Sequence, residues 1–195
     1  MLRLVPTPRV FRRNLKTSIT GLGNPEPQYK GSRHNIGLYI LDQIKSTLVG
    51  NVPYKESLTG SVHYLSINPE LFLIRSDGDF INLSGNTIVP LWRTLPKDTR
   101  HVVIHDDLNL PMGKIQLRGP GTSLRGHNGL KSIDKKLGCK NDFYKLSIGI
   151  DRPESHEPNV VAKYVLDKID PSQLKNINKQ AMSNVLEVLR KEKLI

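Results

Sequence analysis

A strand, a loop and a helix follow one another in residues 18–49, which read SITGLGNPEPQYKGSRHNIGLYILDQIKSTLV. Residues 18–23 have the composition of a short β-strand that runs into a glycine turn. Residues 36–49 carry apolar side chains at the spacing of one helix face: Ile36, Ile40, Leu41, Ile44 and Leu48. A strand followed by an amphipathic helix is typical of α/β proteins, so this stretch predicts that fold class.

The rest of the chain continues to mix strands with helices. We expect a hairpin of residues 62–67 and 71–76, and further strands at residues 101–105, 114–118 and 145–150. Helices are expected at about residues 84–92 and 129–137, the second of them closed by Gly138. Residues 151–159, DRPESHEPN, have the composition of an exposed loop.

The final helix has a clear start signal. Asp170 stands where an N-cap is expected, and Pro171 occupies the first helical position. Because there is no repeat of fixed period and no internal shift in composition, the sequence predicts one three-layer α/β domain over residues 18–195, with a mixed twisted β-sheet flanked by helices. The apolar stripe of the final helix consists of Leu174, Ile177, Ala181, Val185 and Leu189.

The chain is strongly basic. Its 195 residues include 29 lysines and arginines against 18 acidic residues, which gives a formal charge of +11 and a pI near 9.8. Such an excess favours a polyanionic partner, either a nucleic acid or a membrane surface. No stretch approaches the roughly 20 apolar residues that cross a bilayer, so we do not expect an integral membrane protein. Cys139 is the only cysteine, which excludes an internal disulfide and a cysteine-based metal cluster.

Residues 1–17 form a separate N-terminal segment. It is rich in arginine, contains no acidic residue and has apolar residues interspersed, as is typical of a mitochondrial transit peptide. Pro6 and Pro8 would interrupt a helix there. We expect mitochondrial targeting; the alternative is a cytoplasmic protein with a basic disordered arm or an early first strand. The basic residues are Arg3, Arg9, Arg12, Arg13 and Lys16.

The loop in residues 21–37, GLGNPEPQYKGSRHNIG, allows two interpretations. A dinucleotide-binding loop requires Gly-x-Gly-x-x-Gly with a helix that begins inside it. Gly21 and Gly23 fit this pattern, but Glu26 stands at the third glycine position. Prolines on both sides of Glu26 oppose a helix at this point, so we do not favour a nucleotide site.

In the second interpretation, this loop is one wall of an active site. A tight turn presents Asn24, and the loop then brings Tyr29 and His34 to the start of a helix. Histidine is the side chain best suited to proton transfer near neutral pH. A lone histidine at a helix start is more often structural, so His34 is a candidate only in combination with other groups.

Two further clusters lie next to predicted strands or helices. In DFINLSG (79–85), Asn82 lies just before a helix, where it is either a helix cap or a site residue. The next predicted strand ends in His105, Asp106 and Asp107. A carboxylate at a strand end can orient a distant histidine; alternatively, these three side chains could bind a divalent metal.

The fourth cluster, RGHNGLKS (125–132), lies at the mouth of a predicted helix. Free N–H groups and the helix dipole favour anions at such a position. Lys131 and Lys135 are four residues apart and therefore share a helix face. A lysine-rich face is usually only solvated, but beside a glycine loop it favours contact with phosphates through Arg125, Lys131 and Lys135.

Together the clusters supply a histidine, a carboxylate and three asparagines, a set that suits a water-activating hydrolase. Four motifs, GLGNPEPQYKGSRHNIG, FINLSG, HDDLNLP and GHNGLKS, also occur in the order and at the approximate spacing seen in peptidyl-tRNA hydrolases of the bacterial type. The resemblance runs from about residue 18 to the end of the chain. It implies hydrolysis of the ester between a peptide and the 3′ ribose of a tRNA, which recycles tRNA from prematurely released chains.

The resemblance also implies roles for individual residues. His34 matches the family's catalytic histidine, which activates the attacking water, and Asp106 matches the carboxylate that pairs with it. Members of this family need no metal or other cofactor, take peptidyl-tRNA as their partner, and are usually monomers. The matches that line the substrate cleft are Asn24 and Asn82 for the peptide, Asn128 for water and substrate, Tyr29 near the tRNA 3′ end, and Phe80 as an aromatic of the cleft.

The chain departs from the family pattern in three places. Glu26 stands where glycine is usual, residues 118–129 form a longer and more basic glycine-rich loop, and Ser147 replaces a common basic residue. These departures concern the tRNA-binding surface and not the reaction. Two rivals are a non-catalytic RNA-binding module, which intact His34 and Asp106 oppose, and a metal-dependent phosphoesterase, which would need more carboxylates.

Overall fold

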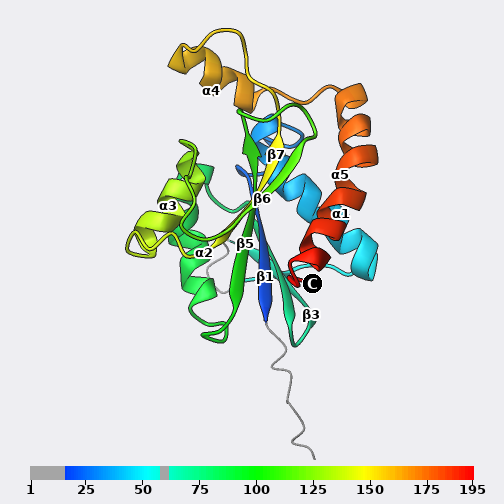
Figure 1. The fold of residues 1–195 in the computed structure, drawn as a ribbon, viewed down its shortest axis with the longest axis vertical. Helices are drawn as coiled ribbons and strands as arrows, with labels where there is room; N and C mark the ends of the chain where they lie inside the picture. The colour runs from blue at the N-terminus through cyan, green and yellow to red at the C-terminus, as the bar shows by residue number, and fades with distance from the viewer. Residues whose placement is uncertain (1–15, 58–61) are drawn as a thin grey trace, which may run out of the picture.

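The chain folds into one mixed β-sheet with helices on both faces (Figure 1). The structure, a computed structural model, describes residues 16–57 and 62–195, without the side chains of residues 179–182. The strands of this part of the chain are β1 (Thr17–Leu22), β2 (Lys55–Glu56), β3 (His63–Asn68), β4 (Leu71–Ser76), β5 (Arg100–Asp107), β6 (Ile115–Arg118) and β7 (Tyr144–Gly149). They pair in the order β2-β3-β4-β1-β5-β7-β6.

The centre of the sheet is parallel and its edges are antiparallel. β1 pairs in parallel with β4 and with β5, and β5 pairs in parallel with β7. β3 pairs antiparallel with β4 and with β2, and β6 pairs antiparallel with β7. The parallel strands therefore end at one edge of the sheet, and ligands of such sheets bind outside that edge.

The helices cover both faces of the sheet and one of its ends. α1 and α5 lie on one face, α2 and α3 lie on the other, and α4 lies beyond the end at which the parallel strands finish (Figure 1). Two single turns of 3₁₀ helix, η1 and η2, lead directly into α1 and α2. The bounds are η1 Arg33–Asn35, α1 Ile36–Val49, η2 Ile81–Leu83, α2 Ser84–Trp92, α3 Asn128–Lys136, α4 Pro158–Leu166 and α5 Pro171–Lys191.

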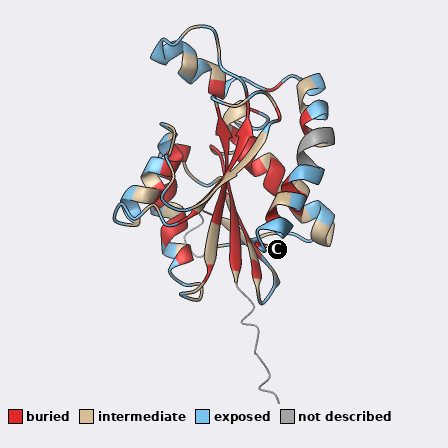
Figure 2. Cartoon of the chain, viewed as in Figure 1, coloured by how far each residue is buried: buried red, intermediate tan, exposed pale blue. Residues whose placement is uncertain are grey.

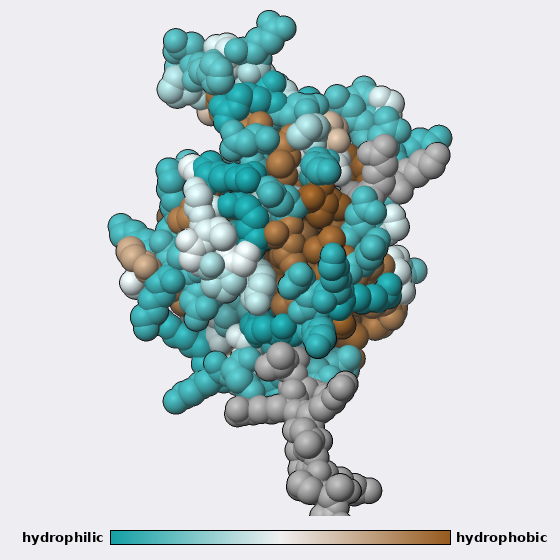
Figure 3. Space-filling model, in the orientation of Figure 1, coloured by the Kyte–Doolittle hydropathy of each residue, from teal (hydrophilic) through white to brown (hydrophobic). Residues whose placement is uncertain are grey.

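Each face of the sheet has its own apolar core. Successive residues of a strand point to opposite faces: Ile104 packs in the core under α1 and α5, whereas its neighbour Val103 packs under α2 and α3. The strands of the sheet centre are buried along most of their length (Figure 2). Hydrophobic residues also gather between the sheet and α5 on a surface that is otherwise mostly hydrophilic (Figure 3). Both cores hold the sheet rigid beneath its carboxyl edge.

Two glycines of the opening stretch allow α1 to lie unusually close to the sheet. A Cβ atom on Gly21 would come within 2.6 Å of the carbonyl oxygen of Gly37. A Cβ atom on Gly37 would come within 2.4 Å of the carbonyl oxygen of Ile104. Side chains at either position would push the helix away, and with it the residues that precede the helix.

The predicted fold class is confirmed, because the sheet is mixed and helices lie on both of its faces. The hairpin of residues 62–67 and 71–76 is β3 and β4, and the helix expected at residues 84–92 is α2. The cap of α5 is also confirmed, since the Asp170 side chain accepts a hydrogen bond from the Ser172 amide at 2.8 Å.

The prediction that residues 151–159 form one exposed loop is wrong at its end. Pro158 occupies the first turn of α4, a helix that the sequence analysis missed. The three valines of this helix lower its intrinsic propensity, so its stability depends on packing against the rest of the chain. The predicted N-terminal arm falls largely on residues 1–15, which lie outside the described residues, as does the side chain of the predicted stripe residue Ala181 in α5.

β1 begins at Thr17, one residue before the predicted start of the domain. Arg100 at the start of β5 donates its amide hydrogen bond to the carbonyl of Lys16 at 2.8 Å, which fastens the beginning of the described chain to the sheet. A search of the described helices for one that is long and apolar enough to cross a membrane finds none.

Candidate active site

A cavity of about 680 Å³ lies at the carboxyl edge of the sheet. Its walls come from the loops after β1, β4 and β5, from the start of α3, and from α4. Segments that are far apart in the sequence meet here because the parallel strands all end at this edge. The predicted site residues that line this cavity are Asn24, Tyr29, His34, Phe80, Asn82, Asp106, Arg125 and Asn128.

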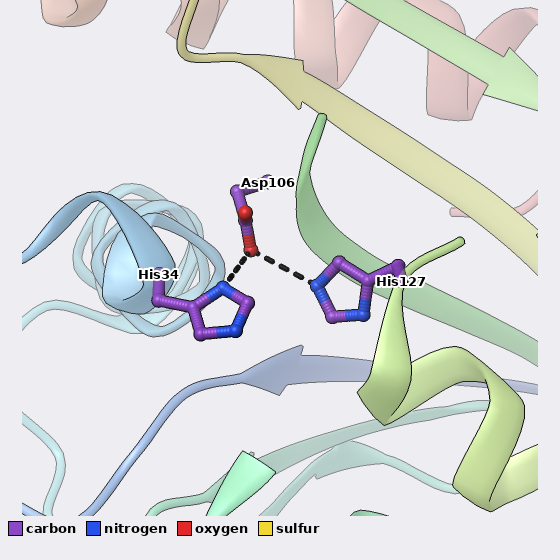
Figure 4. Close-up of side chains that lie close together, drawn as sticks. All are labelled: His34, Asp106 and His127. Atoms are coloured by element: carbon purple, nitrogen blue, oxygen red, sulfur yellow. Dashed lines mark hydrogen bonds and ion pairs between the residues drawn. The ribbon is translucent and has the colours of Figure 1, made fainter. Parts of the chain in front are cut away.

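One carboxylate oxygen at the base of the cavity contacts two histidines (Figure 4). The Oδ1 atom of Asp106 lies 2.7 Å from Nδ1 of His34 and 3.0 Å from Nε2 of His127. η1 carries His34, the end of β5 carries Asp106, and the residue before α3 is His127. The predicted pairing of His34 with Asp106 is present, and a second histidine joins it.

The protonation of this group follows from its contacts. Burial alone would raise the pKa of Asp106, but His34 and His127 hold that pKa well below its usual range. Asp106 is therefore a carboxylate that only accepts, so the ring nitrogen that faces it carries a hydrogen in each histidine. The Nδ1 atom of His127 in turn accepts from the amide of Leu130 at 3.3 Å and caps α3.

The two histidines are left with different free atoms. His34 uses Nδ1 for Asp106, and its Nε2 atom is a free acceptor on a side chain that lines the cavity and is 15% exposed. His127 uses both ring nitrogens, and its side chain is 6% exposed. Only His34 of this pair can therefore accept a proton from a water in the cavity.

The pKa of His34 is raised above its ordinary value. Burial acts to lower this pKa, but the charge of Asp106 and the hydrogen bond to it outweigh burial. His105 behaves in the opposite way: burial is the largest cause that lowers its pKa to about 3, so the ring stays neutral. His34 and His105 therefore differ in basicity, because His34 contacts the carboxylate of Asp106 and His105 contacts its backbone carbonyl.

The predicted alternative of a metal site at His105, Asp106 and Asp107 does not fit the structure. The Nδ1 atom of His105 lies 2.7 Å from the backbone carbonyl of Asp106, to which it donates, and Nε2 accepts from the Ser147 hydroxyl at 3.1 Å. The Oδ2 atom of Asp107 pairs with Arg125. No lone pair of this histidine is free for a metal.

A second set of possible ligand atoms belongs to His34, Asp106 and His127, which all lie within 4.8 Å of one another. Two ligands of one tetrahedral zinc ion, each about 2.1 Å from the metal, lie roughly 3.3 Å apart. The 2.7 Å between His34 and Asp106 is shorter than this and is an ordinary length for a charge-assisted hydrogen bond. The geometry therefore favours a hydrogen-bonded group over a metal site.

Asn24 lies at the turn after β1 and is almost fully buried, yet its side chain lines the cavity. Its Oδ1 atom accepts from the amide of Ile81 at 2.9 Å. Asn35 fixes the backbone of Asn24 through two hydrogen bonds. Its side-chain oxygen accepts from the Asn24 amide at 2.8 Å, and its Nδ2 group donates to the Asn24 carbonyl at 3.0 Å. Since Oδ1 is occupied, the Nδ2 group of Asn24 is the part available as a donor toward the cavity.

The other predicted amides are more exposed. Asn82 is not the cap of α2, because the N-cap is Leu83 and no side chain bonds there; the capping interpretation is therefore wrong. Asn128 begins α3 beside His127. Tyr29 and Phe80 form an edge-to-face pair with ring centroids 6.1 Å apart, and Phe80 is 50% exposed. These rings offer aromatic surface at the cavity wall.

A second groove of about 610 Å³ adjoins the cavity, and Asn82 and Asn128 line both. It runs between α2 and α3 and is lined by Lys131, Lys135 and a third lysine, Lys136. Two of the three residues named for phosphate contact thus share one surface next to the cavity. Arg125, the third, does not line this groove. It lines the cavity itself and pairs with Asp107.

Glu26, which departs from the family pattern, lies outside the cavity. Its Oε2 atom pairs with Arg75 at the end of β4 over 2.8 Å, and Arg75 also pairs with Asp42 and Asp77. The added carboxylate therefore ties the loop after β1 to the sheet, away from the reacting groups.

The sequence analysis missed two parts of this site. No role was predicted for His127, although the His-Asn pair at residues 127–128 repeats the pair at residues 34–35 at the start of another helix. The apolar wall from α4 was missed along with the helix. Its lining residues are Val161, Ala162, Val165 and Leu166.

Comparison with known proteins identifies the family. The model of the family described as "Peptidyl-tRNA hydrolase" matches residues 18–194. The chain belongs to this family. Its activity is accordingly that of a peptidyl-tRNA hydrolase, an enzyme of translation that acts on an ester bond. The bacterial-type resemblance given by the four motifs is confirmed.

Among relatives, the peptidyl-tRNA hydrolase of Saccharomyces cerevisiae is 43% identical over 84% of this chain and 89% of its own length. That of Lawsonia intracellularis is 38% identical over 85% of this chain and 81% of its own length. A crystal structure of a mutant peptidyl-tRNA hydrolase from Acinetobacter baumannii matches with a TM-score of 0.73 and 27% identity, covering 85% of this chain and 83% of that one.

Proposed function

We propose that this peptidyl-tRNA hydrolase cleaves the ester between the peptide and the tRNA with a water molecule activated by His34, without a metal. The observation that carries the proposal is the free Nε2 atom of His34, which lines the cavity while Nδ1 contacts Asp106 at 2.7 Å. This is the arrangement of a general base whose tautomer and orientation are fixed by a carboxylate.

The reaction then balances as follows. Nε2 of His34 accepts a proton from the water, and the water oxygen attacks the ester carbonyl. Asp106 stabilises the imidazolium that forms. When the tetrahedral intermediate collapses, the imidazolium returns the proton to the leaving 3′ oxygen of the ribose. An ester is cleaved far more easily than an amide, so no covalent intermediate with the enzyme is required.

The amide side chains supply binding. The Nδ2 group of Asn24 and the side chains of Asn82 and Asn128 can donate to carbonyl oxygens of the peptide and to the developing oxyanion. Contacts to the peptide backbone do not depend on the peptide sequence, which suits a substrate of variable sequence. We place the 3′ end of the tRNA against the Tyr29–Phe80 ring pair, since nucleobases stack on such surfaces.

We extend this proposal to the tRNA, the assembly and the targeting of the enzyme. Lys131 and Lys135 contact tRNA phosphates from the groove beside the cavity, the enzyme works as a monomer, and residues 18–195 form the catalytic domain. Residues 1–17 act as a mitochondrial targeting segment, which their five basic and no acidic residues support. Fusing residues 1–17 to a fluorescent protein tests this: diffuse cytoplasmic fluorescence would contradict it.

The central experiment compares wild type and His34→Ala on an N-blocked aminoacyl-tRNA, with and without a chelator. We expect the wild type to be active in both conditions and His34→Ala to lose about a thousandfold in kcat/KM, within the range for a general base. Circular dichroism checks that the variant is folded. Near-normal turnover by His34→Ala would remove it from the base role, and loss of wild-type activity with chelator would overturn the metal-free mechanism.

A further inference from the structure

The loop between β6 and α3, residues 119–127, is held at both of its ends by β-strands or by the segment that leads into β7. At the first end, Asn141 donates to the carbonyl of Thr122 at 2.7 Å and accepts from the amide of Gly121 at 2.9 Å. Lys145, which is fully buried, donates to the carbonyl of Gly119 at 3.3 Å. The second end is the segment just before His127. Arg125 in this segment makes a charged contact to Asp107 of β5.

Arg125 binds two side chains of the sheet at once. Its NH1 group donates to Oδ2 of Asp107 at 2.8 Å, and its NH2 group donates to Oε1 of Gln116 at 2.9 Å. The backbone φ of Arg125 is +48°, in the left-handed region that few residues other than glycine adopt readily. A residue held in that conformation needs fixed contacts, and these two bonds provide them.

The partner carboxylate belongs to the residue after Asp106, and both residues line the cavity. Asp107 follows Asp106 in β5, and its side chain is only 1% exposed. Its other carboxylate oxygen is bound by neutral groups of Asn109 at 2.9 and 3.3 Å. A buried carboxylate without a cation is costly, and Arg125 supplies the positive charge from a position two residues before His127.

From this geometry we propose that Arg125 is a positioning residue for hydrolysis and not a phosphate ligand. By pairing with Asp107, it holds His127 against Asp106 and cancels the charge of the second carboxylate beside the catalytic pair. This inference rests on the proposed function. It replaces the expectation, drawn from the sequence, that Arg125 contacts a tRNA phosphate.

The charge effect has a definite sign. A negative charge near an imidazole favours its protonated form. His34 and Asp107 line the same cavity. Loss of the Arg125 cation leaves Asp107 uncompensated, so we expect the pKa of His34 to rise and the base to be neutral only at higher pH. Burial already opposes ionisation of Asp107, and the Asn109 amide and Arg125 keep its pKa low. The other charged or titratable groups around this site are Tyr29, Arg33, His105, Asp106, His127, Arg152 and His156.

Two of the nearby cations have contacts that do not involve Arg125. Arg33 lies 4.1 Å from the ring centroid of Tyr164, and Arg152 donates to Asn109 at 3.0 Å. The effect of an Arg125 variant on His34 is therefore expected to pass through Asp107 and His127.

The test uses Arg125→Gln and Arg125→Lys with two substrates, an N-blocked aminoacyl-tRNA and the same aminoacyl ester on a CCA trinucleotide. Arg125→Gln should lower kcat/KM by about tenfold or more on both substrates, because small displacements near the reacting groups are costly. Arg125→Lys should recover part of this loss. NMR titration of labelled histidine should give a higher pKa for His34 in Arg125→Gln, and adding Asp107→Asn should reverse that rise.

Lys175→Gln on α5 is the matched control, since it removes one exposed positive charge far from this loop and should change neither rate nor pKa. The inference is overturned if Arg125→Gln affects only the full tRNA and reduces the salt dependence of binding, as loss of a phosphate contact would. An unchanged His34 pKa with unchanged rates also overturns it. If the wild type cleaves neither substrate, the proposed function fails; the NMR titration then still shows whether Arg125 controls the pKa of His34, which does not depend on turnover.

Discussion

The pairs His34-Asn35 and His127-Asn128 are the same dipeptide at the start of two helices, but their side chains make different contacts. Both histidines contact Oδ1 of Asp106, at 2.7 and 3.0 Å. His34 reaches it through Nδ1 and keeps Nε2 free, whereas His127 reaches it through Nε2 and uses Nδ1 to cap α3. Which ring nitrogen faces the carboxylate decides which histidine can act as a base.

The two asparagines differ in the same way. Asn35 is buried and closes the turn at Asn24 through two hydrogen bonds, so it serves the scaffold. Asn128 lines both the cavity and the lysine-lined groove. One dipeptide thus supplies a histidine with a free ring nitrogen and a structural asparagine, and the other supplies a structural histidine and an accessible asparagine. The identity of a residue is therefore a poor guide to its role unless its partners are known.

Asp106→Asn tests the element that the two histidines share, and we expect it to have the largest effect of the variants that probe this comparison. The amide oxygen can still accept from both rings, so kcat/KM should fall by about a hundredfold, less than for His34→Ala. Loss of the carboxylate also removes what raises the pKa of His34, while burial still lowers it. The acid limb of the pH–rate profile should therefore move to lower pH.

In the wild type, His34 must be neutral to act, so activity should fall as the pH drops through its raised pKa, above the ordinary value of about 6.5. A pH–rate series on both proteins measures the shift. An acid limb at the same pH in the wild type and in Asp106→Asn would show that Asp106 does not set the basicity of His34.

His127→Ala and His127→Asn separate the cap of α3 from the contact with Asp106. The alanine variant removes the cap and the Asp106 contact. The lost cap should lower the free energy of unfolding by about 1 kcal/mol, and the lost contact should reduce the rate by about tenfold. Asparagine is a good N-cap but is too short to reach Asp106. The asparagine variant should therefore regain the stability lost in the alanine variant, while its rate stays as low. Thermal unfolding and initial rates measure the two effects. Wild-type rates in both variants would make His127 a cap alone.

Lys131→Glu combined with Lys135→Glu tests the surface beside Asn128, and its effect on turnover should be the smallest. We expect tRNA affinity to fall about fivefold, and the slope of log affinity against log salt to become shallower by about two, one for each lost phosphate contact. The matched control is Lys175→Glu with Lys191→Glu on α5, which changes the net charge equally. Equal losses in both double variants would assign the effect to overall charge.

Much of the fold could be predicted from local sequence, and the motifs named part of the cavity lining. The final helix was visible because Asp170 and Pro171 carry its start signal within a few residues. α4 could not be predicted, because its sequence signals conflict. Pro158 favours the start of a helix, but the residues before it have the composition of a loop and three valines lower the helix propensity. Its helix depends on contacts that arise only after folding.

The sequence by itself determined the fold class, the family and the chemical groups of the site, since periodicity and short motifs are local properties. It also placed His34 and Asp106 in the two motifs that had to meet. Only the tertiary structure decided which nitrogen of each histidine faces Asp106 and that Arg125 binds Asp107. Those facts depend on distances between segments 18 to 72 residues apart in sequence. No local pattern encodes such distances, because the packing of the sheet and its helices sets them.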